Sequence, residues 1–156
     1  MIRMSTVSEI LQKARRWCAA QERCQQEARD KLYAWGLHRE QVEQVIGQLI
    51  GEGFINEARF AEHYAVSKFR QKGWGKAKIK AALEAKRVSG PCITLGLKAI
   101  DAEEYAGGLE QAVQKTWAKY RAYSGYERVQ RVKRYLIGKG FDAGAIDAAL
   151  APLREL

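Results

Sequence analysis

The sequence is poor in proline, histidine and cysteine. Proline occurs only at Pro91 and Pro152, so the first ninety residues contain none to break a helix. The three cysteines have no zinc-ligand spacing, and His38 and His63 lie far apart in the sequence. Neither a phosphate-binding GxxxxGK[ST] loop nor an apolar run of about 18 residues occurs, and no signal peptide is recognisable. These absences predict a cytoplasmic protein that is not an enzyme, uses no metal or cofactor and does not enter a membrane.

Hydrophobic and positively charged residues are abundant. Of 156 residues, 47% are hydrophobic and 29% are charged, a balance typical of folded chains and not of disordered ones. The net charge is +9, and the segments 68–87 and 115–139 each sum to +7. Positive charge gathered in this way favours a polyanion as partner, because each neutralised phosphate releases condensed counterions.

The chain repeats itself with one apolar spacing. Three anchor leucines, Leu32, Leu83 and Leu136, are 51 and 53 residues apart. Apolar residues stand four positions before each anchor and five, ten and fourteen after it, at Ala28, Ile79, Val132, Leu37, Val88, Phe141, Val42, Ile93, Ile146, Ile46, Leu97 and Leu150. Pairs spaced by four residues form one stripe on a helix, so each copy predicts a helix, a tight corner and a second helix.

A longer helical stretch precedes each pair, at about 6–20, 56–72 and 101–122. Capping patterns begin at Thr6, Asp101 and Ser124. We therefore predict an all-α protein of nine helices in three tandem three-helix repeats, with limits 1–55, 56–100 and 101–156. Because such a repeat cannot bury its own core well, the repeats should pack at right angles into an elongated, curved array.

Basic residues follow the same register and define the candidate binding site. Arg29, Lys80 and Lys133 each stand three positions before an anchor, on the flank of the apolar stripe. The other predicted members lie beside them on the helices or at the ends of the helices, at Lys68, Arg70, Lys72, Lys76, Lys78, Arg87 and Arg131. Trp74 completes the set, because an aromatic ring among lysines can stack on an unpaired base. The other tryptophans are expected in the core.

Two segments resemble a known family. Residues 53–61 read GFINEARFA, similar to the GYIDDxRFA segment of the RecX regulatory proteins, which are bacterial modulators of the RecA recombinase. Residues 73–80 read GWGKAKIK and lead to Leu83 and to KRV at 86–88, which resembles the GxGxxxI…L..KGI block of that family. The likeness is clear over residues 24–88 and weaker towards the C-terminus.

The resemblance implies three tandem three-helix repeats and a protein that binds the groove of the RecA–DNA filament and inhibits strand exchange and ATP hydrolysis. The implied partners are the RecA filament and single- and double-stranded DNA, and we expect the chain itself to be a monomer. The sequence departs from the pattern at three places. Asn56 remains a competent N-cap, Ala82 replaces an acidic residue, and Arg87 replaces a glycine in a turn that tolerates positive φ, so we expect the local turn to differ.

Two other functions fit the sequence. A helix-turn-helix protein could act on DNA without RecA, although the helices that begin near Cys92 and Asp142 offer few side chains to read bases. A helical adaptor could bind proteins alone, with the lysines serving only solubility.

Overall fold

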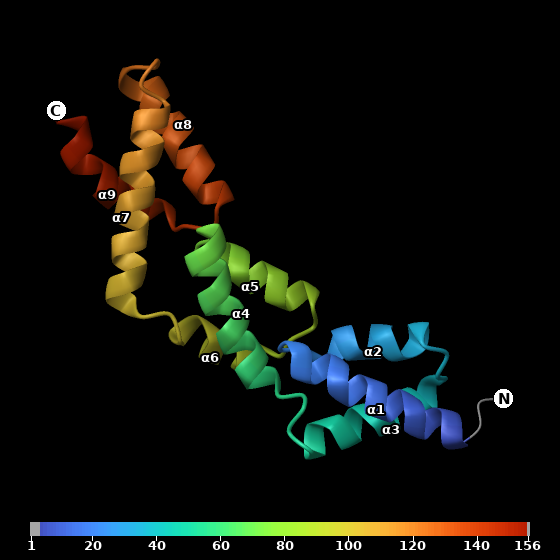
Figure 1. The fold of residues 1–156 in the computed structure, drawn as a ribbon. Helices are drawn as coiled ribbons and strands as arrows, with labels where there is room; N and C mark the ends of the chain where they lie inside the picture. Colours follow the sequence, from blue (N-terminus) through green and yellow to red (C-terminus); the bar gives the residue numbers. More distant parts are fainter. Residues whose placement is uncertain (1–3, 156) are drawn as a thin grey trace. The chain divides into compact units, whose positions relative to one another are not determined.

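The computed structural model describes residues 4–155, and every regular element in that range is an α-helix. The helices are α1 Met4–Ala20, α2 Gln25–Ala34, α3 Arg39–Gly51, α4 Glu57–Lys72, α5 Lys76–Ala85, α6 Gly90–Lys98, α7 Ala102–Lys119, α8 Gly125–Gly138 and α9 Ala143–Arg154 (Figure 1). The predicted all-α class with repeated helical units is confirmed.

The chain divides into two compact units. Unit 1 comprises Met1–His63 and Leu83–Gly96, and unit 2 comprises Tyr64–Ala82 and Leu97–Leu156. The boundaries fall inside α4, α5 and α6, so these helices give residues to both units. The limits proposed for the three repeats, at 55 and 100, stay a prediction.

Unit 1 has a core formed by one side each of α1, α2 and α3, the helices that Figure 1 shows side by side. Its centre is apolar, and Leu32, Val42 and Leu49 have almost no exposed surface. Trp17 and Trp35 pack on the core and contact each other edge to face, with ring centroids 6.2 Å apart. Each ring also carries a cation, since Arg23 lies 4.2 Å from the Trp17 ring and Lys13 lies 4.5 Å from the Trp35 ring. A leucine at either place could fill the space but could not hold the cation.

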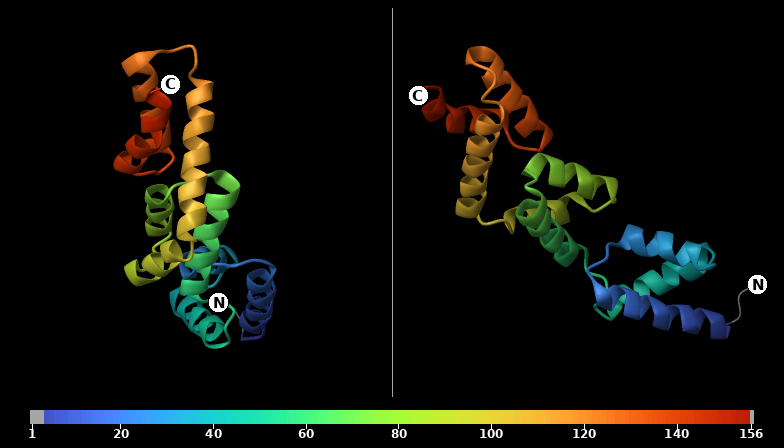
Figure 2. Two further views of the ribbon diagram at one scale, coloured as in Figure 1. Left: turned by 90° about the vertical axis from the view of Figure 1, so that its left-hand side faces the viewer. Right: turned by 45° about the horizontal axis from the view of Figure 1, so that its top comes forward.

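Unit 2 has a second core where α7, α8 and α9 meet, which two further views show in Figure 2. Val113, Val132 and Ile146 are completely buried there. The same pairing of arginine and tryptophan recurs: Arg128 lies 3.8 Å from the Trp117 ring and donates to the Trp117 carbonyl at 2.6 Å. Near its C-terminal end α7 therefore has an arginine on a tryptophan ring, as α1 has in unit 1.

The apolar register predicted from the sequence matches the burial. Every one of the anchor, −4, +5, +10 and +14 positions is buried except Leu97, which is half-buried. The predicted stripes are thus the faces by which the helices pack, and the +5 residues close the corners.

All three corners carry the same backbone hydrogen bonds. The +5 N–H donates to the anchor carbonyl at Leu37–Leu32 (3.2 Å), Val88–Leu83 (3.1 Å) and Phe141–Leu136 (3.1 Å). The +4 N–H donates to the +1 carbonyl at Gly36–Tyr33 (3.0 Å), Arg87–Glu84 (2.9 Å) and Gly140–Ile137 (2.9 Å). This pair of bonds defines the Schellman motif, whose +4 residue takes a left-handed conformation.

Arg87 adopts that conformation although it is not glycine. Its φ is 60°, against 98° at Gly36 and 102° at Gly140. Our expectation that the turn would differ here was wrong, because the two corner bonds hold the backbone in the left-handed region despite the Cβ atom.

Helix capping agrees with the sequence in part. The Asp101 side chain accepts from the Glu104 N–H at 2.9 Å, and Asn56 accepts from the Arg59 N–H at 3.0 Å, as predicted. Ser124 is an N-cap without a side-chain hydrogen bond. The Thr6 prediction was wrong, because α1 already begins at Met4 and Thr6 lies within its first turn.

Two glycines of unit 2 let the α4–α5 turn touch the α8–α9 corner. A Cβ atom on Gly75 would lie 2.4 Å from the Gly140 carbonyl carbon, and one on Gly140 would lie 2.6 Å from the Lys78 N atom. The Gly75 N–H donates to the Lys139 carbonyl at 2.7 Å, and the Ala77 N–H donates to the Gly140 carbonyl at 3.0 Å. Backbone contact at this distance leaves no room for a side chain.

Replacing Gly75 with alanine should lower the free energy of unfolding by about 2 kcal/mol or more, because the new methyl group overlaps backbone atoms that cannot move away alone. Gly107→Ala in α7 is the matched control. Its Cβ would meet no atom within 4 Å, and we expect it to stabilise the helix by about 0.5–1 kcal/mol. Urea unfolding followed by circular dichroism measures both. Equal effects would contradict the close contact.

Replacing Arg87 with glycine should raise the free energy of unfolding by about 0.5–1 kcal/mol, because glycine adopts the left-handed conformation without strain. The greater conformational entropy of glycine in the unfolded chain offsets part of this gain. Gly36→Ala, the opposite change at the equivalent corner, should lower it. Thermal melts of the two variants test this, and a less stable Arg87→Gly protein would mean that Arg87 makes compensating contacts.

Candidate nucleic-acid interface

The α4–α5 turn of unit 2 presents a tryptophan between two lysines. Lys68 Nζ lies 5.2 Å and Lys78 Nζ 4.7 Å from the centroid of the Trp74 ring, and Lys68 also lies 5.3 Å from the Tyr64 ring. Gly73 turns the chain here with a φ of 68°, and the Trp74 N–H donates to the Lys68 carbonyl at 3.2 Å. We call Tyr64, Lys68, Trp74 and Lys78 the Trp74 cluster. The sequence had predicted three of its four members.

The N-terminus of α5 is closed to an anion. The backbone N–H groups of Gly75 and Ala77 donate to carbonyls, and that of Lys76 donates to the Tyr105 hydroxyl at 2.9 Å. Burial raises the pKa of Tyr105, so the hydroxyl stays neutral. Lys76 Nζ lies 4.9 Å from the same ring. Any phosphate bound near this turn must therefore be held by lysine side chains and not by the helix end.

Arg29, Lys80 and Lys133 occupy the same register position but differ in whether a carboxylate pairs with them. Arg29 Nε lies 2.8 Å from Glu43, and Lys133 Nζ lies 2.9 Å from Asp147. Both acids stand eleven positions after their anchors, where the second copy has Thr94. The hydrogen bond from Arg29 lowers the pKa of Glu43, which stays ionised at neutral pH.

Lys80 is the exposed member of this register, and within residues 4–155 it has no carboxylate at ion-pair distance. In the first and third repeats, a carboxylate of the protein itself therefore pairs with the predicted contact residue, Arg29 or Lys133. In the second repeat, Lys80 stays available to a ligand.

The remaining predicted residues fall into different surroundings. Arg70 makes a bidentate pair with Glu104, at 2.7 and 2.9 Å, and its hydrogen bonds lower the pKa of that carboxyl. Arg131 stacks on Tyr123 at 3.9 Å and lies 3.3 Å from Glu127. Lys72 and Arg87 are exposed.

Other cations were missed by the sequence analysis. Lys115, Lys119 and Lys139 lie in the basic segment 115–139, and Lys119 Nζ lies 4.3 Å from the Tyr135 ring. Their charge was included in the sum for that segment. Two of them, Lys115 and Lys119, lie in the long helix α7, which has no anchor leucine from which their position on the helix could be predicted.

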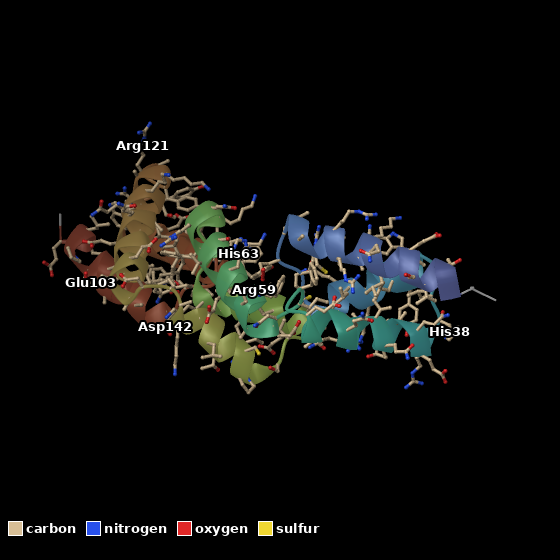
Figure 3. All side chains as sticks on the ribbon, turned by 60° about the horizontal axis from the view of Figure 1, so that its bottom comes forward. His38, Arg59, His63, Glu103, Arg121 and Asp142 are labelled. Carbon is tan, nitrogen blue, oxygen red and sulfur yellow. The ribbon has the colours of Figure 1, made fainter. Side chains whose placement is uncertain are left out.

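The described residues hold no group of three or more histidine, cysteine or acidic side chains suited to a metal. Figure 3 labels His38 at the start of α3 and His63 on α4, on different helices. Burial raises the pKa of the Cys24 thiol to about 11, so it stays protonated at neutral pH. Within the described part, no helix has the length and apolarity to span a bilayer.

The GFINEARFA segment has a structural role in unit 1. Arg59, labelled in Figure 3, donates to both carboxylate oxygens of Glu22 at 2.7 Å and to the Gly53 carbonyl at 3.0 Å. The motif therefore fixes the start of α4.

Two family models match the repeats described above. One describes the second three-helix domain of RecX and covers residues 56–97, and the other describes the third three-helix domain and covers residues 103–150. The chain belongs to the RecX family. The resemblance found in the sequence is confirmed.

Individual RecX proteins agree with this assignment. The chain is 27% identical over 128 residues to the regulatory protein RecX of Oceanobacillus iheyensis, covering 82% of this chain and 47% of that protein. It is 29% identical over 120 residues to that of Clostridium perfringens, covering 76% and 56%. The chain thus spans about half the length of these curated relatives. Membership in this family supports a regulatory role.

Solved RecX structures share the fold. The crystal structure of RecX from Lactobacillus salivarius matches with a TM-score of 0.86 and 22% identity, covering 99% of this chain and 100% of that one. A second crystal structure of regulatory protein RecX matches with a TM-score of 0.84 and 21% identity, covering 92% and 71%. Helical repeats of the RecX type are therefore a property of this chain too.

Proposed function

We propose that this chain is a non-enzymatic regulator that binds the RecA–DNA filament and inhibits strand exchange and ATP hydrolysis. Family membership gives the regulatory role, and the RecX resemblance names RecA as the partner. The observation that carries the contact with DNA is the Trp74 cluster, in which a half-exposed indole lies between two lysines.

The chemistry of this cluster suits a nucleic acid better than a plain acidic surface. Lysine ammonium groups neutralise phosphates, and an aromatic face can stack on a base that the filament leaves unpaired. Lys80 adds a third cation from the same helix as Lys78, and no carboxylate of residues 4–155 lies at ion-pair distance from it. The second repeat is therefore the main DNA contact in this proposal, with Arg29 and Lys133 contributing less.

A helix-turn-helix protein that acts without RecA is the other candidate. The α6 helix would be its reading helix in the second repeat, yet its side chains include one basic residue, Lys98, and no amide. An adaptor that binds proteins alone would leave the Trp74 cluster without a role.

The decisive measurement is DNA-dependent ATP hydrolysis and strand exchange by RecA, with this protein added from far below the RecA concentration upward. Inhibition at substoichiometric amounts is expected, since one bound regulator affects a whole filament. Inhibition only when the protein coats all the DNA would overturn the filament proposal in favour of simple DNA binding. Inhibition that does not change with salt concentration would favour the adaptor.

Reversing three lysines, Lys68→Glu, Lys78→Glu and Lys80→Glu together, should abolish the inhibition without unfolding the protein. None of the three forms an ion pair within the described residues, so their loss costs little stability. A charge-matched control reverses Lys13, Lys31 and Lys98, which lie outside the cluster. Circular dichroism checks folding. A folded cluster variant that still inhibits like the control would exclude the Trp74 cluster as the contact.

Freeing the two internally paired cations should strengthen DNA binding. In the Glu43→Gln, Asp147→Asn double variant, Arg29 and Lys133 lose their carboxylates, and each can neutralise a phosphate. At about 0.15 M salt each new contact is worth up to about fivefold in affinity and steepens the salt dependence by nearly one unit. Fluorescence anisotropy with a labelled oligonucleotide measures both. Glu9→Gln with Glu110→Gln removes the same net charge without breaking an ion pair, and equal gains from the two variants would show a general charge effect only.

A further inference from the structure

A groove of about 1030 Å³ lies within unit 2, away from the ring of Trp74. Its sides are the last turn of α4, one face of α7 and the end of α8, helices that Figure 2 shows from two directions. Phe69, Leu136 and Phe141 form an apolar floor, and Lys72, Lys115 and Lys139 stand at the rim. The groove therefore combines an apolar base with a positively charged edge.

The rim carries positive charge that the described residues do not neutralise. Arg70 and Glu104 also line the groove, but they bind each other through both carboxylate oxygens. None of the three lysines has a carboxylate at ion-pair distance within residues 4–155, and Lys139 Nζ donates only to the neutral carbonyl of Lys72, at 3.4 Å. Three uncompensated cations around one groove favour an anionic ligand.

The floor favours a peptide over a nucleic acid. Phe69 and Phe141 are 7% and 4% exposed and pack on Tyr105 with ring centroids 5.3 and 5.6 Å apart, so neither presents a face on which a base could stack. Tyr135 is 38% exposed and lines the groove, but it is not part of this floor, and Lys119 Nζ lies 4.3 Å from its ring. A shallow apolar floor accepts an aliphatic side chain instead.

Gly107 borders the open part of the groove. It lies near the middle of α7 and lines the groove, where glycine costs a helix about 1 kcal/mol relative to alanine. The neighbouring Gly108 has a packing reason, since a Cβ atom there would lie 2.7 Å from the Phe69 ring. At Gly107 no atom lies within 4 Å of the Cβ position. The space that this glycine leaves is filled by nothing in the described chain.

We propose that this groove binds a short acidic segment of a partner protein, with a leucine-like side chain on the floor and flanking carboxylates on Lys72, Lys115 and Lys139. The segment lies along α7 over Gly107. Because Lys72 was one of the predicted DNA contacts, this assignment moves it from the nucleic-acid interface to a protein-binding site.

The test uses the full chain and a short fluorescein-labelled peptide in which pairs of glutamate alternate with single leucines. Two control peptides replace every glutamate with glutamine or every leucine with alanine. We expect saturable binding of the first peptide and affinity lowered by about tenfold or more for each control, since the site needs both the charge and the apolar side chain. An oligothymidine should not displace the peptide.

Variants locate the binding on the protein. Gly107→Leu should abolish peptide binding by filling the groove, while its melting temperature stays equal or rises because leucine favours the helix. Lys115→Gln with Lys139→Gln should weaken binding about tenfold. Lys98→Gln, outside the groove, should leave it unchanged.

Three results would overturn the proposal: no saturable peptide binding, equal binding of the control peptides, or binding that survives Gly107→Leu. Displacement by oligothymidine, with loss of oligothymidine binding in Gly107→Leu, would assign the groove to nucleic acid instead. The Trp74 cluster is not altered in these variants, and RecA is absent from the assay. Failure here therefore leaves the proposed function standing, and failure of the RecA assay leaves this groove standing.

Discussion

The corner that ends the second helix of each repeat is the constraint on which the other contacts depend. Two backbone hydrogen bonds reverse the chain there and bring the +5 residue under the anchor, so both helices can bury their stripes on the same side. In unit 2 the corner at Gly140 has a second function. Its carbonyl and that of Lys139 accept from the start of α5, which positions Lys76 and Lys78. A change in this corner would therefore disturb the core and the candidate interface together.

Positive charge in this protein is largely placed on aromatic rings or beside carboxylates. Arg23 and Arg128 lie on tryptophans, and Arg29 and Lys133 are held by acids. Partly exposed pairs of this kind contribute about 1 kcal/mol or less each, so their effect on stability is modest. Their effect on binding is greater, because they decide which cations remain for a ligand. Ion pairing leaves the net charge of +9 unchanged, but it restricts the places at which a polyanion meets an unpaired cation.

The sequence predicted the features that depend on local spacing. Helix positions, buried stripes and corners follow from periods of three and four residues and from glycine, and Leu97 was the one register position that is not fully buried. The pairing of Arg29 with Glu43 could also have been predicted from the sequence, since Asp147 stands at the same register position as Glu43. It was missed because flank positions were judged on a single helix, without the neighbouring helix that contacts them.

The groove of unit 2 could not be found from the sequence. Lys72, Lys115 and Lys139 come from three helices or their ends, and only the packing of α4 and α8 on α7 brings them to one rim. The sequence cannot distinguish Gly107 from Gly108, because their difference is a tertiary contact: the Phe69 ring lies against Gly108 and not against Gly107.

The groove and the Trp74 cluster share the last turn of α4. Lys68 and Lys72 are four residues apart and so lie on one side of that helix, one facing Trp74 and the other the groove. The Gly75–Gly140 contact follows this turn of α4, at the start of α5. The backbones of the two segments touch there, so neither segment can shift without the other. A segment bound in the groove would press on the same turn that presents Trp74. Rigid backbone contacts of this kind are how occupation of one site can change the affinity of another, provided that the turn has two arrangements that the ligands distinguish.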